Sequence, residues 1–185
     1  MLAFLIFPSH TSAHCDTLDG PVVSAARKSL DRDNISYVLI WVKPENEDEL
    51  KKAFKRVKGK KRLAKTKEEK EKAEMEFFEL LVRIHREGEG VAYEGIKPAG
   101  SIEPEIALAD KAIESGKLDK VLAKISSDKS KEISRHLFHH LKERAKYEVN
   151  DLVSGRKYIE AYVRFIHTVE KAIKDLEASE RAHHH

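Results

Sequence analysis

Cys15 is the residue whose type and neighbours most directly suggest chemistry. It stands between His14 and Asp16, and the Gly20-Pro21 pair that follows predicts the start of a helix. Because the positive end of a helix dipole stabilises a thiolate, we expect a metal-ligating or reactive sulfur here. The alternative is an unpaired cysteine that has no role or forms an intermolecular disulfide.

Two histidines on predicted helices are further candidates. On a helical wheel His85 clusters with Leu81 and Val82, so we expect it on an apolar face, where a polar group needs a partner. It is either a ligand or proton-handling residue, or a core histidine that is hydrogen-bonded for packing. His167 falls opposite Phe165, on the more polar side of its helix.

Thiolate and imidazole donors together suit copper, nickel or zinc. The sequence therefore predicts a transition-metal site formed by Cys15, His14 and His85, with His167, Asp16 or Asp19 as further ligands.

A second candidate metal site is the pair His136 and His140, which lie one helical turn apart. They flank a stripe formed by Ile133, Leu137 and Leu141, so we expect this face near the interior. No third ligand is evident, and surface or capping histidines are the alternative.

The absence of common motifs narrows the function. The chain has no P-loop, no G-x-G-x-x-G, no H-E-x-x-H and no Glu-x-x-His of the di-iron type. Its single cysteine excludes an intramolecular disulfide framework and any site that needs two thiolates from one chain. Nucleotide and di-iron chemistry are therefore unsupported.

Composition and periodicity predict an all-α fold. The 185 residues include only eight Gly and five Pro, and 36% are charged, a helix-friendly and thermophile-like composition. An offset of about 83 residues aligns two similar halves, which predicts a helical bundle of two pseudo-twofold repeats. The alignment places Lys28, Leu30, Ile35, Val38 and Leu39 on Lys111, Ile113, Leu118, Val121 and Leu122.

The predicted organisation is one helical domain over 14–182. It comprises repeat one at 20–88, a Gly-rich linker at 88–101 and repeat two at 102–178, and the terminal 183–185 are expected to be a purification-tag remnant. A capping box at Thr66 and Glu69 predicts the start of a long helix that ends at Gly88.

The first 13 residues predict export. Leu2 to Phe7 form a short apolar run, and small residues up to Ala13 suit signal-peptidase cleavage, although no basic region precedes the run. Cleavage there would make His14 the N-terminus. The alternative is a retained apolar arm in a cytoplasmic protein. The run is too short for a stable membrane span.

A basic stretch from Lys51 to Lys70 contains eleven Lys or Arg and two acidic residues, while the whole chain carries a net charge of only +3. Phosphate contacts would need such a stretch, but it lacks interleaved aromatic residues and any base-reading motif. We therefore expect a solvated helix face rather than a nucleic-acid interface.

The motifs of the chain resemble an uncharacterised family of small prokaryotic helical proteins, a domain of unknown function. They are AHCDTLDGPVV at 13–23, VLIWVKPE at 38–45, LVRIHREGEG at 81–90, IKPAG at 96–100 and YVRFIH at 162–167. The resemblance implies a helical fold, frequent export and a recurrent His-Cys-Asp start, and it implies no reaction.

A shorter stretch is similar to the N-terminal nickel hook of nickel superoxide dismutase. His14, Cys15, Asp16 and Gly20 match that hook, but Asp19 occupies the place of its second thiolate and Leu18 that of its proline. The resemblance implies metal binding more than dismutation.

Two functions follow as hypotheses. The first is an exported helical protein that binds copper, nickel or zinc, with redox activity as an option. The second is a non-catalytic scaffold or homo-oligomer whose histidines are structural.

Overall fold

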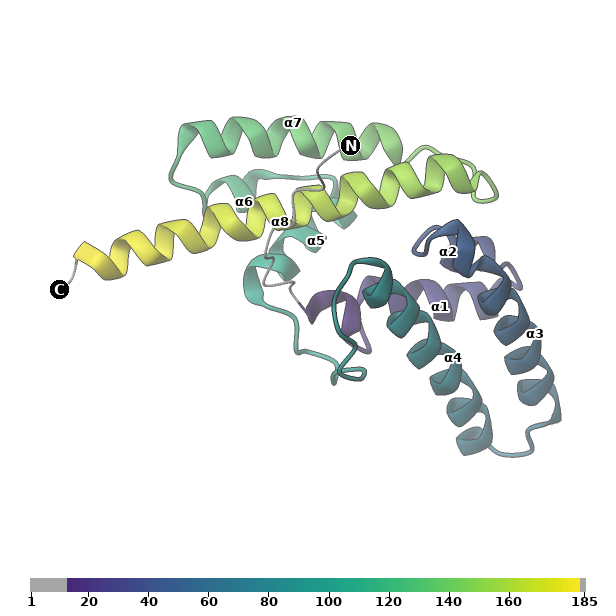
Figure 1. Cartoon of the computed structure of the whole chain (residues 1–185). Helices are drawn as coiled ribbons and strands as arrows, with labels where there is room; N and C mark the ends of the chain where they lie inside the picture. Colours follow the sequence, from purple (N-terminus) through teal and green to yellow (C-terminus); the bar gives the residue numbers. More distant parts are fainter. Residues whose placement is uncertain (1–12, 184–185) are drawn as a thin grey trace.

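The structure, a computed structural model, describes residues 13–183 and the side chains of 14–176. Within that range the regular structure consists of α-helices and short 3-10 helices, with no strand beyond one isolated bridge (Figure 1). The predicted all-α class is confirmed. The apolar run at 2–7 and the last two histidines lie outside the described residues.

Four α-helices precede the linker. The first half contains the 3-10 helix η1 (Ala13–Asp16), α1 (Pro21–Asp31), α2 (Ser36–Leu39), the 3-10 helix η2 (Pro44–Asn46), α3 (Glu47–Leu63) and α4 (Lys67–Gly88). The second half contains α5 (Pro104–Ser115), α6 (Asp119–Leu122), α7 (Asp128–Arg144) and α8 (Leu152–His183).

Local sequence signals set several of these bounds. Pro21 occupies the first turn of α1, where its missing N–H leaves no intrahelical bond unmade. The Thr66 side chain accepts the backbone N–H of Glu69, whose carboxylate accepts the backbone N–H of Thr66, so the predicted capping box is present.

The two halves use the same order of helices and the same pairings. In the first half α3 and α1 both pack on α4, and in the second α7 and α5 both pack on α8. Figure 1 shows α7 running beside the long α8 and the α3–α4 hairpin at the other end of the molecule. This order fits two repeats, although equivalence of the two halves by superposition stays a prediction.

Arg156, near the start of α8, joins the halves. Its guanidinium donates to the backbone carbonyls of Leu39 at 3.2 Å and Val42 at 3.1 Å, and forms an ion pair with Glu47 at 2.6 Å. One side chain thus satisfies carbonyls at the end of α2 and holds that turn against α8.

The histidines of α7 differ from the expectation. His136 and His140 are exposed, and so is Ile133, at 42%. The buried face of α7 comprises Ser134, Leu137, Phe138 and Leu141. The expectation that His136 and His140 lie near the interior is wrong, because α7 packs through the side that carries Phe138 and leaves Ile133 exposed.

The basic stretch lies on α3 and at the start of α4, where acidic side chains partly neutralise it. Lys58 pairs with Asp33 and Lys61 with Glu74. Among the described helices, none combines the length and apolar character that a membrane crossing requires.

Two glycines inside helices give opposite predictions. Nothing lies within 4 Å of a Cβ built on Gly59 in α3, whereas one built on Gly155 in α8 would lie 2.4 Å from Cγ2 of Ile40. We expect Gly59→Ala to stabilise the protein by about 0.5–1 kcal/mol through reduced chain entropy. We expect Gly155→Ala to destabilise it by about 1–3 kcal/mol through overpacking between the halves. Urea unfolding of both variants measures the difference, and equal shifts would contradict this packing.

Candidate functional site

The segment that carries His14 and Cys15 is held by the residues that follow it. The Thr17 hydroxyl donates to the carbonyl of His14 at 3.3 Å, and the Gly20 N–H donates to the carbonyl of Thr17 at 3.0 Å. A Cβ at Gly20 would lie 2.2 Å from the His14 carbonyl oxygen. Only glycine therefore allows this close approach of the chain to itself.

The linker holds the same segment from the other side. The Lys97 N–H donates to the carbonyl of Asp16 at 2.8 Å, and the Leu18 N–H donates to the carbonyl of Lys97 at 3.0 Å. The Gly100 N–H donates to the carboxylate of Asp19 at 2.8 Å, and this bond lowers the pKa of Asp19. Asp19 is exposed and bound to the linker, apart from the other predicted ligands.

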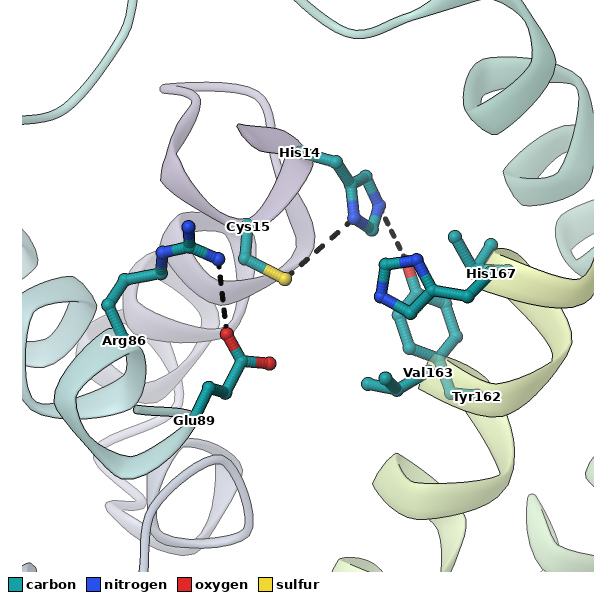
Figure 2. Close-up of a pocket in the computed structure, with 8 residues that line it drawn as sticks. His14, Cys15, Arg86, Glu89, Tyr162, Val163 and His167 are labelled. Carbon is teal, nitrogen blue, oxygen red and sulfur yellow. Dashed lines mark hydrogen bonds and ion pairs between the residues drawn. The ribbon is translucent and has the colours of Figure 1, made fainter. Parts of the chain in front are cut away.

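A small pocket lies where η1, the end of α4 and α8 meet (Figure 2). Its volume of about 10 Å³ is close to the space that one water molecule needs. It has no room for an organic substrate. The lining residues are His14, Cys15, Arg86, Glu89, Tyr162, Val163, Ile166 and His167.

His14 is fixed by hydrogen bonds at Nε2. Tyr162 donates its hydroxyl proton to one oxygen of Asp110 at 2.8 Å, and His14 Nε2 lies 3.0 Å from the other oxygen and 2.8 Å from the phenol. These acceptors assign the ring proton to Nε2 in the neutral imidazole. The lone pair of Nδ1 then faces Cys15, whose Sγ lies 3.7 Å away.

Cys15 is a buried thiol. Only 7% of the residue is exposed, and burial, helped by the charges of Glu89 and Asp16, raises its pKa well above the ordinary value. The expected thiolate at a helix N-terminus is therefore wrong for the protein without a bound cation. The reason is that Cys15 is buried in the turn η1, where loss of solvent outweighs any effect of the α1 dipole.

His85 is buried on the apolar face of α4, as predicted. Its Nδ1–H donates to the carbonyl of Trp41 at 2.9 Å, and its Nε2 has no hydrogen-bond partner. That Nε2 lies 3.5 Å from a carboxylate oxygen of Glu89. A buried ring nitrogen without a hydrogen-bond partner is unusual in a purely structural histidine.

Arg86 links the buried Asp16 to the more exposed Glu89. Its guanidinium lies 3.2 Å from Asp16 and 3.1 Å from Glu89. Burial raises the pKa of Asp16, and the positive charge of Arg86 works against that shift. Asp16 thus faces Arg86, while Glu89 connects Arg86 to His85.

His167 lies at the outer side of the pocket. Its side chain is 40% exposed, and Nδ1 lies 3.1 Å from the buried carboxylate of Glu170. Glu170 also pairs with Lys174 at 2.7 Å. His167 thus lines the same pocket as His14 and Cys15, but its Nδ1 is directed to its own helix.

The structure brings part of the predicted site together. His14, Cys15 and His167 line one pocket, and His85 adjoins it through Glu89. Over the described residues, however, no group of three His, Cys, Asp or Glu side chains is arranged to hold a metal ion. Donors stand instead in two pairs, His14 with Cys15 and His85 with Glu89.

The order of thiol, imidazole and carboxylate in Cys15, His14 and Asp110 is one that activates nucleophilic cysteines in some enzymes. The raised pKa of Cys15 and the size of the pocket disfavour that chemistry. The same imidazole, whose Nε2–H is hydrogen-bonded to the carboxylate of Asp110, is arranged as is typical of a histidine that binds a metal through its other nitrogen.

Sequence reasoning missed Asp110, Tyr162, Arg86 and Glu89 as members of the site. Asp110 had a signal, because it stands one turn after Ile106, next to Ala109, and both are buried. The argument that singled out His85, a polar residue on an apolar face, would have found it. Arg86 and Glu89 adjoin His85 in sequence but carry no spacing signal of their own.

The raised pKa of Cys15 predicts a dependence of stability on pH. Above pH about 8.5 an unfolded thiol loses its proton while the folded one retains it, so the free energy of unfolding falls by up to about 1.4 kcal/mol per pH unit. Below that pH the contribution is constant. Cys15→Ser lacks the effect. The difference in the free energy of unfolding between the wild type and Cys15→Ser, measured by urea unfolding, should therefore shrink from about pH 8.5 upward. Parallel curves would contradict the assignment.

Comparison with known proteins places the chain in a family. Searches of curated proteins and of solved structures return no match. The model of a family of unknown function, DUF6448, matches residues 19–168, which is most of the chain. The protein therefore belongs to the DUF6448 family.

Proposed function

We propose that the protein binds one transition-metal ion at the pocket of His14 and Cys15. The observation that carries the proposal is the pair itself: two soft or borderline donors, both buried, with Nδ1 and Sγ 3.7 Å apart beside a space of single-atom size. An ion between them could contact both donors with little movement, because Zn–S and Zn–N bonds are about 2.3 Å and 2.1 Å long.

Both buried imidazoles support this proposal. His14 donates its Nε2–H to Asp110, and His85 donates its Nδ1–H to the carbonyl of Trp41. In metal-ligating histidines such a hydrogen bond orients the ring and leaves the other ring nitrogen unprotonated for the metal. Here the other ring nitrogen of His14 faces Cys15 and that of His85 faces Glu89, and Cys15 and Glu89 line the same pocket. His85 and Glu89 would complete the site through a small closure.

The electrostatics of the pocket also favour a cation. The charges of Glu89, Asp16 and Asp110 all raise the pKa of Cys15, and the charge of Arg86 acts in the opposite direction. A bound divalent ion would reverse the effect of burial on the pKa of Cys15, because a coordinated thiol is deprotonated outright. Metal binding should therefore release a proton.

Sulfur and imidazole donors indicate copper, nickel or zinc. A nickel dismutase hook is not part of the proposal, since Asp19 replaces the second thiolate and bonds to the linker. Export, with His14 as the new N-terminus, stays part of the proposal because its free amine would add a donor.

The test is metal titration of the tag-free, metal-free full chain by calorimetry and elemental analysis. We expect one equivalent of Cu²⁺, Ni²⁺ or Zn²⁺ to bind, and Cys15→Ser and His14→Ala to abolish this binding. The control variant His136→Ala, His140→Ala changes exposed histidines only and should bind as the wild type does. Binding that survives in both pocket variants but is lost in the control would overturn the proposal.

A graded prediction concerns Asp110. Asp110→Asn retains the shape of the side chain but removes the charge that orients His14, so we expect metal affinity to fall about 10–100-fold. The same titration measures it, with circular dichroism as a check on folding. Unchanged affinity would show that His14 does not act through Asp110.

A second candidate is a helical scaffold in which the polar cluster joins the halves. The bonds of His14 to Tyr162 and Asp110, which tie η1 to α8 and α5, favour it. If no metal binds to the wild type in any titration, the scaffold is the function that remains.

A further inference from the structure

A continuous row of aromatic rings runs from the pocket toward the surface. The ring centroids of Tyr162 and Tyr158 lie 6.4 Å apart on successive turns of α8, and those of Tyr158 and Tyr147 lie 5.5 Å apart. Both distances are within the range of aromatic pairs in contact. Tyr162 is buried, whereas Tyr158 and Tyr147 are partly exposed. The row thus begins in the interior and reaches solvent.

At its inner end the row branches to both buried imidazoles. The rings of Tyr162 and His14 stack at 5.9 Å, and Trp41 contacts Tyr162 at 5.8 Å and His85 at 5.7 Å. Packing alone requires no such arrangement, because Phe would fill the same space without a buried hydroxyl that needs partners.

We propose that Tyr147, Tyr158 and Tyr162 form a relay that carries single electrons from the His14–Cys15 pocket to a one-electron oxidant at the surface. The relay rests on the proposed metal site for its electron donor. The geometry of the rings and their hydrogen bonds is independent of any metal.

The environment of Tyr162 suits this role. Its hydroxyl is a hydrogen-bond donor to Asp110, so its resting state is the phenol. A phenol that loses an electron becomes a strong acid and must release its proton. The carboxylate of Asp110, which accepts the Tyr162 hydroxyl at 2.8 Å, is in place to receive it.

The oxidant takes one electron from Tyr147, which releases its phenolic proton to water. Tyr158 then gives one electron to Tyr147 and its phenolic proton to water, and Tyr162 gives one electron to Tyr158. Tyr147 and Tyr158 each take back one proton from water. Tyr162 is left as a neutral phenoxyl radical, and Asp110 is protonated. A copper or nickel ion in the pocket would return one electron to Tyr162 and rise by one in oxidation state, while the proton returns from Asp110. Without a redox-active ion, Cys15 would supply the electron, pass its proton to Nδ1 of His14 and become a thiyl radical.

The test uses the metal-free full chain, so that it does not depend on the proposed function. Photogenerated ruthenium(III) tris-bipyridine serves as the one-electron oxidant, and radicals are trapped by rapid freezing. High-field electron paramagnetic resonance then distinguishes two kinds of phenoxyl radical: one with a single fixed hydrogen-bond donor, called here the hydrogen-bonded signal, gives a narrow gx line, whereas the varied hydrogen bonds of water spread gx over a broad range. We expect the hydrogen-bonded signal in the wild type.

Phe variants keep the ring packing and remove the transferable proton. Tyr162→Phe should lose the hydrogen-bonded signal. Tyr158→Phe should give this signal in much lower yield, because the row is interrupted. Asp110→Asn should lose it as well, because the proton acceptor is gone. The control is Tyr93→Phe, in the linker outside the row, which should give the wild-type signal.

A wild-type radical with only the solvent-exposed signature would overturn the relay, and so would an undiminished hydrogen-bonded signal in Tyr158→Phe. Circular dichroism of each variant confirms that folding is retained. Metal binding without the radical would leave the proposed function intact, whereas the radical without metal binding would leave the relay without its proposed donor.

Discussion

The segment from His14 to Thr17 is polar and buried, so its hydrogen-bonding groups need partners inside the protein. Those partners come from three separate regions: the linker through Lys97, α4 through Arg86, and the second half through Asp110. A buried polar group left unpaired costs about 1–3 kcal/mol. The need to satisfy this one segment therefore fixes how the two halves and the linker meet.

The same burial determines the protonation state of the pocket. Low polarity disfavours the Cys15 thiolate, and the nearby carboxylates disfavour it further, while Arg86 compensates only in part. Without a cation Cys15 is thus a protonated thiol beside the imidazole of His14. A positive ion at the same place would meet two carboxylates and a sulfur that gains charge. The nearby carboxylates that make the site unfavourable for an anion also make it suited to a cation.

Local patterns predicted the parts of the fold that depend on local chemistry. The start of α1 at Pro21 and the capping box at Thr66 are set by backbone groups within one helical turn. The burial of His85 followed from its place on the wheel of α4. These features need no knowledge of what lies across the fold.

The site depends on contacts that local patterns do not contain. The environment of Cys15 was mispredicted because its burial depends on α4 and α8, which lie far from it in the sequence. Asp110 was missed because its partner His14 is 96 residues away in the chain. His136 was misplaced because Phe138, and not Ile133, lies on the side of α7 that meets α8, and this depends on the packing partner.

The sequence separations within the pocket have a consequence for biosynthesis. His14 is 148 residues from Tyr162, and contacts between such distant residues form late. During translation the N-terminal part folds first, so the His14–Cys15 pair leaves the ribosome well before α8 exists to cover it. For that interval the sulfur is open to the surrounding medium. An ion or an oxidant can reach it then without any opening of the finished protein, and docking of α8 ends that access.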